Sequence, residues 1–438
     1  MNMPRLSPDM MARYDIPSHR PPKVNAIQFG LSDILLGTVD RLIDAADVGL
    51  GLVCVEAGQT GYARRLNEQA GLYTVVVRGY EGESPVRREQ VVQCVLKALP
   101  MEDATSLAAD PTIELAIVDD DPTARTLAAQ FIEARKTVGL PSLPLLSLGD
   151  MAGSSVYPLL ADCLAFRAEP EDAARECREM NYLDDMLHLA EPHARLTLTL
   201  PEPLRQLFPL NQIPEIRFVS EPEMLLEQAL HHQVFKAGLF LMIGAGWLNG
   251  CDTLHDCMTQ PRLREFVGRA FTEELMPALD ALPRERLEAR VIESFSRYED
   301  PLNRHKLLRC TRGLLLHFVK YLVPVMERWA QSEFEPPRRL SFALASLIML
   351  YAGARLNPST KRYEVTRGRH TEALEDDPDQ LSVFSTLSHD MPPEVLSYAA
   401  LADRELWNGM DLRRIEGLEA RIALDLSAIQ RHPSFLPA

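Results

Sequence analysis

Two histidines and a lysine precede a long apolar run in the middle of the chain. The segment 231–250 reads HHQVFKAGLFLMIGAGWLNG. His232 and Lys236 are four residues apart, so an α-helix would place them on one face, with His231 about 140° round the axis from Lys236. An amine or imidazole that enters an apolar environment can act as a base near neutral pH. The same pattern is typical of a lysine at the end of a buried helix, so it predicts either a proton-transfer site or a helix of the core.

A second group of candidate residues lies where one predicted helix ends and the next begins. Arg297 precedes the break at Pro301 and His305 follows it, so the two side chains can converge on one point. A guanidinium group suits a carboxylate or a pair of neighbouring hydroxyls through two parallel hydrogen bonds. Arg297 and His305 therefore predict substrate binding or, equally, an ion-paired corner between two helices.

Two clusters contain residue types that bind metals. Cys251, His255 and Cys257 have spacings of four and two, which do not place all three on one helical face, and structural zinc takes four ligands. The acidic turn 119–121 follows a predicted strand, where carboxylates usually cap the next helix. We therefore expect no metal site.

The first part of the chain has the alternating strands and helices of a Rossmann-like α/β domain. Residues 24–29 predict a buried strand, Gly30 a turn and residues 34–46 a helix, which is the opening of a βαβ unit. The next predicted strand ends at Glu56, and an acid at this place binds the adenosine ribose in dinucleotide folds. Ser32 stands where a second phosphate-binding glycine is expected. This segment predicts either a dinucleotide site or a Rossmann-like domain that has lost one.

The apolar pattern changes near residue 225. Before this point we expect further strands over 72–79, 113–118, 143–148, 195–200 and 215–219, and helices over 123–138 and 154–169. Beyond it the apolar residues recur at helical spacing, apart from a polar stretch at 361–390 that predicts a loop. The expected organisation is an N-terminal arm over 1–23, a Rossmann-like α/β domain over 24–225 and a mostly α-helical domain over 226–438.

The composition argues against several classes of protein. The chain has 438 residues, of which 46% are hydrophobic and 25% charged, as in an ordinary globular protein. Its net charge of −16 would repel a phosphate backbone, so we expect no nucleic-acid partner. Seven scattered cysteines indicate reduced thiols. No apolar run is long enough for a membrane span or shaped like a signal peptide, so we expect a cytoplasmic protein.

The order of several motifs resembles the mannitol dehydrogenase family, the long-chain polyol and sugar-acid dehydrogenases. IQFG before a helix is followed by QAGLYTVVVRG, NGCDTLHDCMTQPRLREFVGRAFTEELMPALD, RYEDPLNRH and RRLSFALASLIMLYAG. The likeness runs from about Val24 to the C-terminus and is greatest to the tagaturonate (altronate) reductase branch. It implies a Rossmann domain, a helical domain and an active site between them. It also implies hydride transfer between NAD or NADP and a carbon that carries a hydroxyl or ketone.

The catalytic positions depart from the pattern that the resemblance implies. The family carries a lysine base, an asparagine five residues later and a histidine three further on, and these positions hold His231, Lys236 and Leu239 here. In the cofactor loop, Ser32 replaces the second glycine and Leu36 replaces an arginine. The element that contains Arg297 and His305 is retained. Loss of the family's base and oxyanion ligands would nearly abolish its mechanism unless the site has been rebuilt.

Three functions are therefore compatible with the sequence. The first, which we expect, is an NAD- or NADP-dependent oxidoreductase that acts on a small sugar acid or polyol. In this enzyme Lys236 or His231 would be the base, Arg297 and His305 would hold the substrate, and Glu56 would bind the ribose. The second is a catalytically inactive homologue that binds a partner, and the third is a non-redox isomerase or epimerase of a keto sugar. The sequence fixes neither the sugar nor the oligomeric state.

Overall fold

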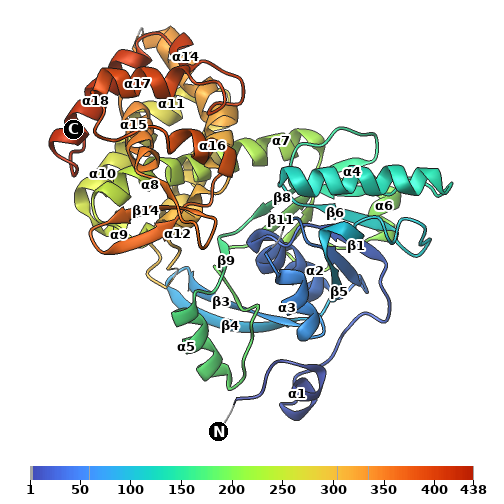
Figure 1. Ribbon diagram of the computed structural model, residues 1–438. Coiled ribbons are helices and arrows are strands. Elements are labelled where there is room, and N and C mark those ends of the chain that lie inside the picture. The colour runs from blue at the N-terminus through green and yellow to red at the C-terminus, as the bar shows by residue number, and fades with distance from the viewer. Residues whose placement is uncertain (1–2, 59, 303, 334, 438) are drawn as a thin grey trace. The chain divides into compact units, whose positions relative to one another are not determined.

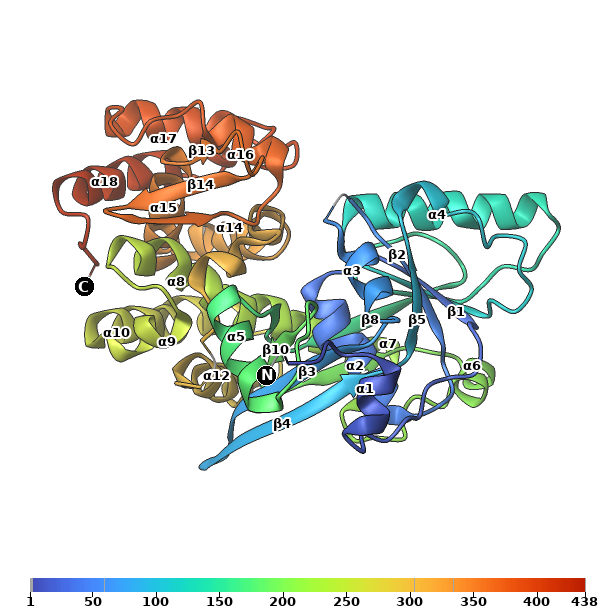
Figure 2. The same cartoon turned by 60° about the horizontal axis from the view of Figure 1, so that its bottom comes forward.

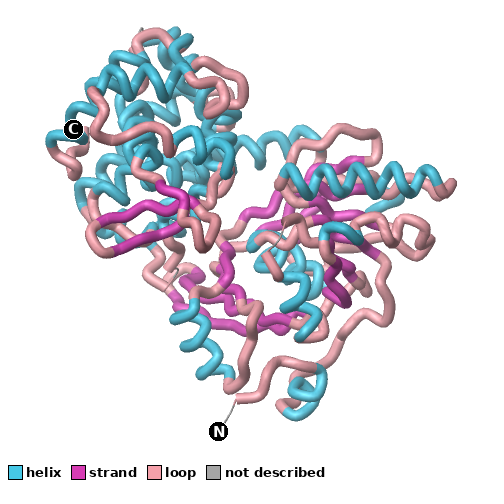
Figure 3. The backbone as a smooth tube through the Cα atoms, in the orientation of Figure 1, coloured by secondary structure: helices cyan, strands magenta, loops and turns pink. Residues whose placement is uncertain are grey.

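The computed structural model describes residues 3–58, 60–302, 304–333 and 335–437, and it consists of two compact units, Met1–Leu225 and Leu226–Ala438. Strands gather in the first unit, whereas helices make up most of the second (Figure 3). This confirms the predicted fold class, a Rossmann-like α/β domain followed by a mostly α-helical domain. Among the described residues, no helix has the length and apolar character needed to cross a membrane.

The core of the first unit is an eight-stranded sheet (Figure 1). Its strands lie in the order β12-β11-β8-β7-β6-β1-β2-β5. Neighbouring strands are parallel except for β8 and β11. The bounds are β1 Ala26–Phe29, β2 Leu52–Val55, β5 Val95–Leu99, β6 Leu115–Val118, β7 Leu145–Ser147, β8 Val156–Asp162, β11 Arg195–Leu198 and β12 Ile216–Phe218. In a parallel sheet the carboxyl ends of the strands share one edge, which is where such folds bind ligands.

A second, four-stranded sheet of order β4-β3-β10-β9 completes the first unit, and its β3–β4 hairpin is long (Figure 2). Its bounds are β3 Tyr73–Glu81, β4 Ser84–Val92, β9 Ala165–Arg167 and β10 His188–Ala190. The helices of this unit are α1 Pro8–Arg13, the π-helix η1 Leu35–Asp40, α2 Arg41–Ala46, α3 Tyr62–Glu68, the 3-10 helix η2 Met101–Asp103, α4 Pro122–Thr137, α5 Pro170–Met180 and α6 Glu202–Leu207. Helix α1 lies within the expected N-terminal arm, and its Met10 and Met11 belong to a buried cluster with residues of this sheet such as Val76 and Phe166.

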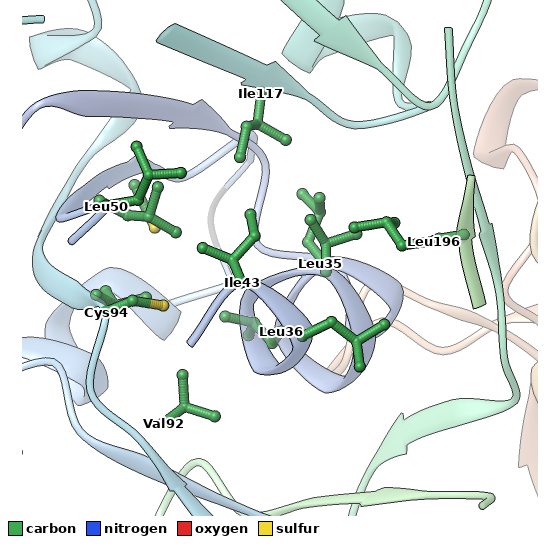
Figure 4. Close-up of a cluster of buried hydrophobic side chains, with 14 of the residues drawn as sticks. Leu35, Leu36, Ile43, Leu50, Val92, Cys94, Ile117 and Leu196 are labelled. Carbon is green, nitrogen blue, oxygen red and sulfur yellow. The ribbon is translucent and has the colours of Figure 1, made fainter. Parts of the chain in front are cut away.

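Segment η1–α2 supplies much of the apolar core of the first unit. Leu35, Leu36 and Ile43 belong to one buried cluster with strand residues such as Ile117 and Leu196 (Figure 4). This segment begins five residues after Gly30, so its packing helps to fix the position of the first turn of the βαβ unit.

The predicted helix over 154–169 is wrong, because this region forms strands β8 and β9. Its apolar residues recur at spacings of three and four, which resemble one face of a helix. Strand β8, however, lies between β7 and β11 inside the large sheet. A strand covered on both faces shows no alternation of apolar and polar residues, so the pattern of a short run cannot separate it from a helix.

The second unit is built around α8, Lys236–Leu248, which is buried from Ala237 to Trp247. Helix α7, Glu221–Leu230, spans the boundary between the two units. The other helical segments of the second unit are η3 His231–Phe235, α9 Leu254–Thr259, α10 Pro261–Ala270, η4 Phe271–Leu275, α11 Met276–Ala278, α12 Arg284–Glu299, η5 Leu307–Thr311, α13 Leu314–His317, η6 Phe318–Leu322, α14 Val323–Glu333, α15 Arg338–Ala352, α16 Pro378–Phe384, α17 Pro393–Ala402, η7 Leu412–Arg414 and α18 Leu418–Arg431. Of these, η3, η4 and η6 are π-helical. A three-stranded sheet contains β13 Arg355–Leu356, β14 Tyr363–Arg367 and β15 His370–Ala373.

The stretch 361–390 is not the expected loop, because it contains β14, β15 and α16. Arg367 pairs with His370 across a two-residue turn whose first residue, Gly368, has φ 62°. A glycine at this position is typical of the tight turns that join antiparallel strands. Most side chains of the β14–β15 hairpin are exposed or half-buried. Its sequence is therefore mostly polar, like that of a loop.

Gly244 allows α8 to approach α15 more closely than any side chain would permit. A Cβ atom at this position would lie 2.5 Å from the carbonyl carbon of Ser346 and 2.6 Å from the amide nitrogen of Leu347. Both atoms belong to the backbone of α15, so neither can move away without displacing the helix.

We predict that Gly244→Ala destabilises the protein by about 1–3 kcal/mol, because it overpacks this helix contact. Gly268 in α10 is the matched control, since a Cβ there meets no atom within 4 Å. Gly268→Ala should stabilise the protein slightly, by up to about 1 kcal/mol, through helix propensity. Thermal unfolding followed by circular dichroism measures both effects. A Gly244→Ala protein that melts with or above the wild type would contradict the close packing.

Asp40 is a fully buried carboxyl group in η1. It accepts hydrogen bonds from Nε2 of Gln28 at 3.3 Å and from the hydroxyl of Tyr73 at 3.2 Å. Burial outweighs these two bonds and raises the pKa of Asp40 to about 7. A group whose pKa rises on folding binds more protons in the folded state, so its contribution to stability falls as pH rises from its unfolded value towards 7.

We therefore predict that Asp40→Asn reduces the loss of stability between about pH 4 and pH 7, because asparagine does not ionise. The slope should not vanish, since burial also raises the pKa of Asp376 in the second unit to about 7. Melting temperatures across this pH range test the prediction, with substitution of the exposed Asp9 by asparagine as the control. An unchanged slope in Asp40→Asn would show that this carboxyl group is not the titrating one.

Candidate functional site

His231 and Lys236 lie one above the other because the segment between them is a π-helix. In η3 the amide of Lys236 donates its hydrogen bond to the carbonyl of His231, five residues earlier. Such a turn stacks residues five apart, as an α-turn stacks residues four apart. The separation of about 140° expected for an α-helix is therefore wrong. Single π-turns occur frequently at functional sites, but no local residue pattern distinguishes one from an α-turn.

Phe235 is the centre around which His231 and Arg297 come together. The guanidinium of Arg297 lies 3.7 Å from the centre of the Phe235 ring, and the His231 ring stacks at 5.7 Å. Arg290, two turns before Arg297 on α12, lies 5.6 Å from the same ring. Both arginines are buried, and Arg290 pairs with Glu293 at 2.5 Å. Sequence reasoning missed Arg290, although its spacing of seven from Arg297 indicates a shared helix face.

The contact between Arg290 and His231 fixes which nitrogen of the imidazole carries the proton. Nη2 of Arg290 lies 3.3 Å from Nδ1 of His231. A guanidinium can only donate, so Nδ1 accepts and a neutral ring keeps its proton on Nε2. Lys236, one π-turn after His231, is half-buried. The catalytic roles of both residues stay predictions.

His305 belongs to a corner that α9 holds in place. The backbone amide of Leu254 donates to the carbonyl of His305 at 3.2 Å, and Nδ1 of His255 donates to the carbonyl of Glu299 at 2.7 Å. Helix α9 itself begins with a capping box in which Thr253 and Asp256 cap each other's backbone amides. The CDTLHDC motif therefore scaffolds this corner. His305 is buried, and its role in substrate binding stays a prediction.

A further group of residues, which sequence reasoning missed, comes from α13 and η6. The ring of Tyr321 stacks on His232 at 4.0 Å and 7°. Nε2 of His317 donates to the backbone carbonyl of His232 at 3.0 Å. His317 is 85 residues away from His232 in the chain, and no spacing rule links them. Nζ of Lys320 lies 4.9 Å from the centre of the Tyr321 ring. We name the following residues the basic cluster: His231, His232, Lys236, Arg290, Arg297, His317 and Lys320.

In the first unit, Gly30 and Glu56 meet at the carboxyl edge of the large sheet. The amide of Gly30 donates to the carbonyl of Val55, the residue before Glu56, at 2.9 Å. Gly30 has φ 109°, and a Cβ there would lie 2.5 Å from Cβ of Asp119. Glycine is required at this position by both the backbone conformation and the side chain of Asp119.

Ser32 begins the helix that follows Gly30. Its hydroxyl accepts from the amide of Leu35 at 3.4 Å, so Ser32 acts as a helix cap. The carboxylate of Glu56 accepts from the amide of Tyr62 at 2.9 Å and from the hydroxyl of Thr60. Among the described residues both bonds fall on Oε1 of Glu56, which leaves Oε2 for a ribose hydroxyl. Glu56 can therefore hold the adenosine ribose of a dinucleotide. The loop between Gly30 and the helix capped by Ser32 contains a single glycine and does not match the usual diphosphate-binding loop.

Relatives with known activities cover nearly the whole chain, although no family model matches it. The altronate oxidoreductase of Yersinia pestis is 25% identical over 484 aligned positions, which cover 95% of this chain and 96% of the relative. That of Klebsiella pneumoniae is 26% identical over 483 positions with the same coverage. Both alignments are longer than this chain of 438 residues, so the relatives contain segments that it lacks.

Two solved structures share the fold. Mannitol 2-dehydrogenase of Pseudomonas fluorescens, in a ternary complex with NAD and D-mannitol, has a TM-score of 0.78 at 13% identity and covers 99% of this chain and 96% of its own. A D-sorbitol dehydrogenase has a TM-score of 0.61 at 12% identity, with coverages of 98% and 99%. The full-length relatives, the shared fold and the ordered motifs support the resemblance to the mannitol dehydrogenase family, and to its altronate reductase-like branch in particular.

Proposed function

We propose that this protein is an oxidoreductase that interconverts a hydroxyl group of a sugar acid and the corresponding ketone. The observation that carries the proposal is the basic cluster, in a chain of net charge −16. Arg290, Arg297 and His231 of this cluster lie around Phe235, which Lys236 follows directly in the chain. Buried or half-buried cations are costly unless a structural or bound anion compensates them. A carboxylated sugar would supply such an anion, and the altronate named for the relatives is of this class.

The residues of the cluster have complementary roles in this proposal. Lys236, as the free amine, takes the proton of the substrate hydroxyl, and Nε2 of His231 donates a hydrogen bond to the oxygen on which negative charge develops. Arg297 binds the carboxylate, and the Phe235 ring holds its guanidinium flat. Oxidation then requires the unprotonated amine and should become faster as pH rises, whereas ketone reduction should become faster as pH falls.

The cofactor of this reaction is a nicotinamide dinucleotide, which supplies the acceptor for the hydride. We propose NAD in preference to NADP, because Glu56 is a buried carboxylate at the end of β2. A carboxylate accepts hydrogen bonds from two ribose hydroxyls but repels the extra phosphate of NADP. We expect the diphosphate to bind weakly, because the loop has only the one glycine, Gly30, and Ser32 already caps the helix that follows it.

We predict that Glu56→Gln weakens NADH binding and narrows the preference for NADH over NADPH. Glutamine keeps an oxygen that can accept from Tyr62 and Thr60, so the turn should stay intact while the charge is lost. Fluorescence titration of both reduced dinucleotides measures the effect. Wild-type protein that binds neither dinucleotide would contradict the proposed cofactor, and an unchanged preference in Glu56→Gln would contradict the role of Glu56.

We predict that Lys236→Met lowers kcat for D-altronate oxidation by about 10²–10⁴-fold, the usual contribution of a general base. Arg297→Ala should chiefly raise KM, because it removes a ligand of the carboxylate. The exposed Lys136 of the first unit provides the control, and Lys136→Met should match the wild type. Steady-state assays with D-altronate and with uncharged D-altritol separate the two roles, since Arg297→Ala should matter less for the polyol. Full turnover in Lys236→Met would rule out this base.

A further inference from the structure

Two imidazoles of the basic cluster contain a buried nitrogen that the function proposed above does not use. The rings of His232 and His317 lie 5.6 Å apart, on η3 and at the end of α13. Tyr321 contacts both rings, at 4.0 Å from His232 and 5.2 Å from His317. Across the part of the chain that the structure describes, Nδ1 of each ring is buried and has no hydrogen-bond partner. A buried polar atom without a partner costs about 1–3 kcal/mol, so its presence calls for a physical reason.

The hydrogen bond of His317 determines the character of its Nδ1 atom. Nε2 of His317 lies 3.0 Å from the carbonyl oxygen of His232. A carbonyl can only accept, so Nε2 carries a proton and donates it. In the neutral ring Nδ1 is therefore a bare acceptor, and it becomes a donor only if the ring takes up a second proton. Because His317 is only 7% exposed, this proton would stay inside the cluster.

The surroundings keep both rings neutral in the absence of an anion. Burial lowers the pKa of His317, and the positive charge of Lys236 lowers it further, together with His231 and Lys320. Burial also lowers the pKa of His232, and the same neighbours add to the effect. Among the described residues, further charged or titratable groups near the cluster include Tyr321 of η6, Arg290, Glu293 and Arg297 of α12, and Cys310 of η5. An anion that binds here would offset this positive field and favour the protonated ring.

We propose that a carboxylate binds at the basic cluster together with one proton, which is taken up on Nδ1 of His317. The proton comes from the solvent, and the protonated Nδ1 then donates a hydrogen bond to the carboxylate or to a water molecule that bridges to it. No covalent bond changes. His317 is thus a proton-coupled specificity residue that distinguishes a sugar acid from an uncharged polyol. The identity of the carboxylate as that of a sugar acid rests on the proposed function, whereas the proton coupling does not.

Proton uptake on binding tests this inference without any turnover. We would titrate the full-length protein with D-altronate, in the absence of dinucleotide, by calorimetry in two buffers that differ in ionisation enthalpy. We expect uptake approaching one proton per altronate near neutral pH, and affinity that improves by up to about tenfold for each pH unit lowered. His317→Gln can keep a donor to the carbonyl of His232, and it should abolish most of the uptake. Substitution of the exposed His432 by glutamine is the control and should leave the uptake unchanged.

Three results would overturn the inference: binding of D-altronate without proton uptake, uptake that persists in a folded His317→Gln protein, or equal uptake with uncharged D-altritol. If D-altronate does not bind at all, it is not the substrate, and the same titration with D-gluconate and acetate tests another sugar acid and the carboxylate site alone. Failure of these two anions to bind would remove the proton-coupled site as well. If His317→Gln does not fold, the pH dependence of altronate affinity in the wild type decides, and an affinity independent of pH contradicts the inference.

Discussion

The contact between α8 and α15 is the constraint on which the second unit depends. Gly244 brings the two backbones within van der Waals distance, and α8 is surrounded by protein from Ala237 to Trp247. Because α8 is packed so tightly, it cannot rotate about its axis, and the direction of its first residue, Lys236, is fixed. The direction of Lys236 is therefore set by packing two turns away, and the π-turn of η3 absorbs the local change in helical phase. Stability and site geometry in this unit have the same origin.

Charge is the second constraint, because the site gathers cations in a chain that is acidic overall. Part of this charge is neutralised within the unit, since Glu293 pairs with Arg290 and lies 3.9 Å from Arg297. The phenyl ring of Phe235 lies under the guanidinium of Arg297. Burial lowers the pKa of His232 and His317, and the positive neighbours lower it further, so both rings are neutral. Such an arrangement is poised for an anion, and perturbed titratable groups of this kind cluster at functional sites.

More of the fold than of the candidate site could be predicted from the sequence. The spacing of apolar residues and the turn at Gly30 were enough to predict the strand, turn and helix there. The same spacing predicted that the chain beyond residue 225 is mostly helical. Strand β8 could not be predicted, because a strand buried on both faces has no period of two. The π-turn after His231 and the approach of His317 depend on tertiary packing, which local spacing does not record. Reading His231 and Lys236 at α-helical spacing therefore placed them on different faces.

The retained fold and the altered motif leave the chemistry open to three interpretations, and the structure favours one of them. An inactive homologue is the less favoured interpretation, because the full-length relatives are oxidoreductases. An isomerase would need a base that moves a proton between two carbons, whereas the roles proposed for Lys236 and His231 are those of a base and a hydrogen-bond donor for one oxygen atom. Oxidation of a carbinol uses both groups at once.

The most direct measurement follows carbon-bound deuterium. D-altronate that carries deuterium on its carbinol carbons would be incubated with the protein and NAD, and the products analysed by mass spectrometry. The account predicts one deuterium in the reduced dinucleotide for each ketone formed. Deuterium released to water, or retained in a rearranged sugar without reduced dinucleotide, would contradict it and indicate an isomerase. Unchanged D-altronate under conditions where the protein binds it would contradict it in favour of an inactive homologue.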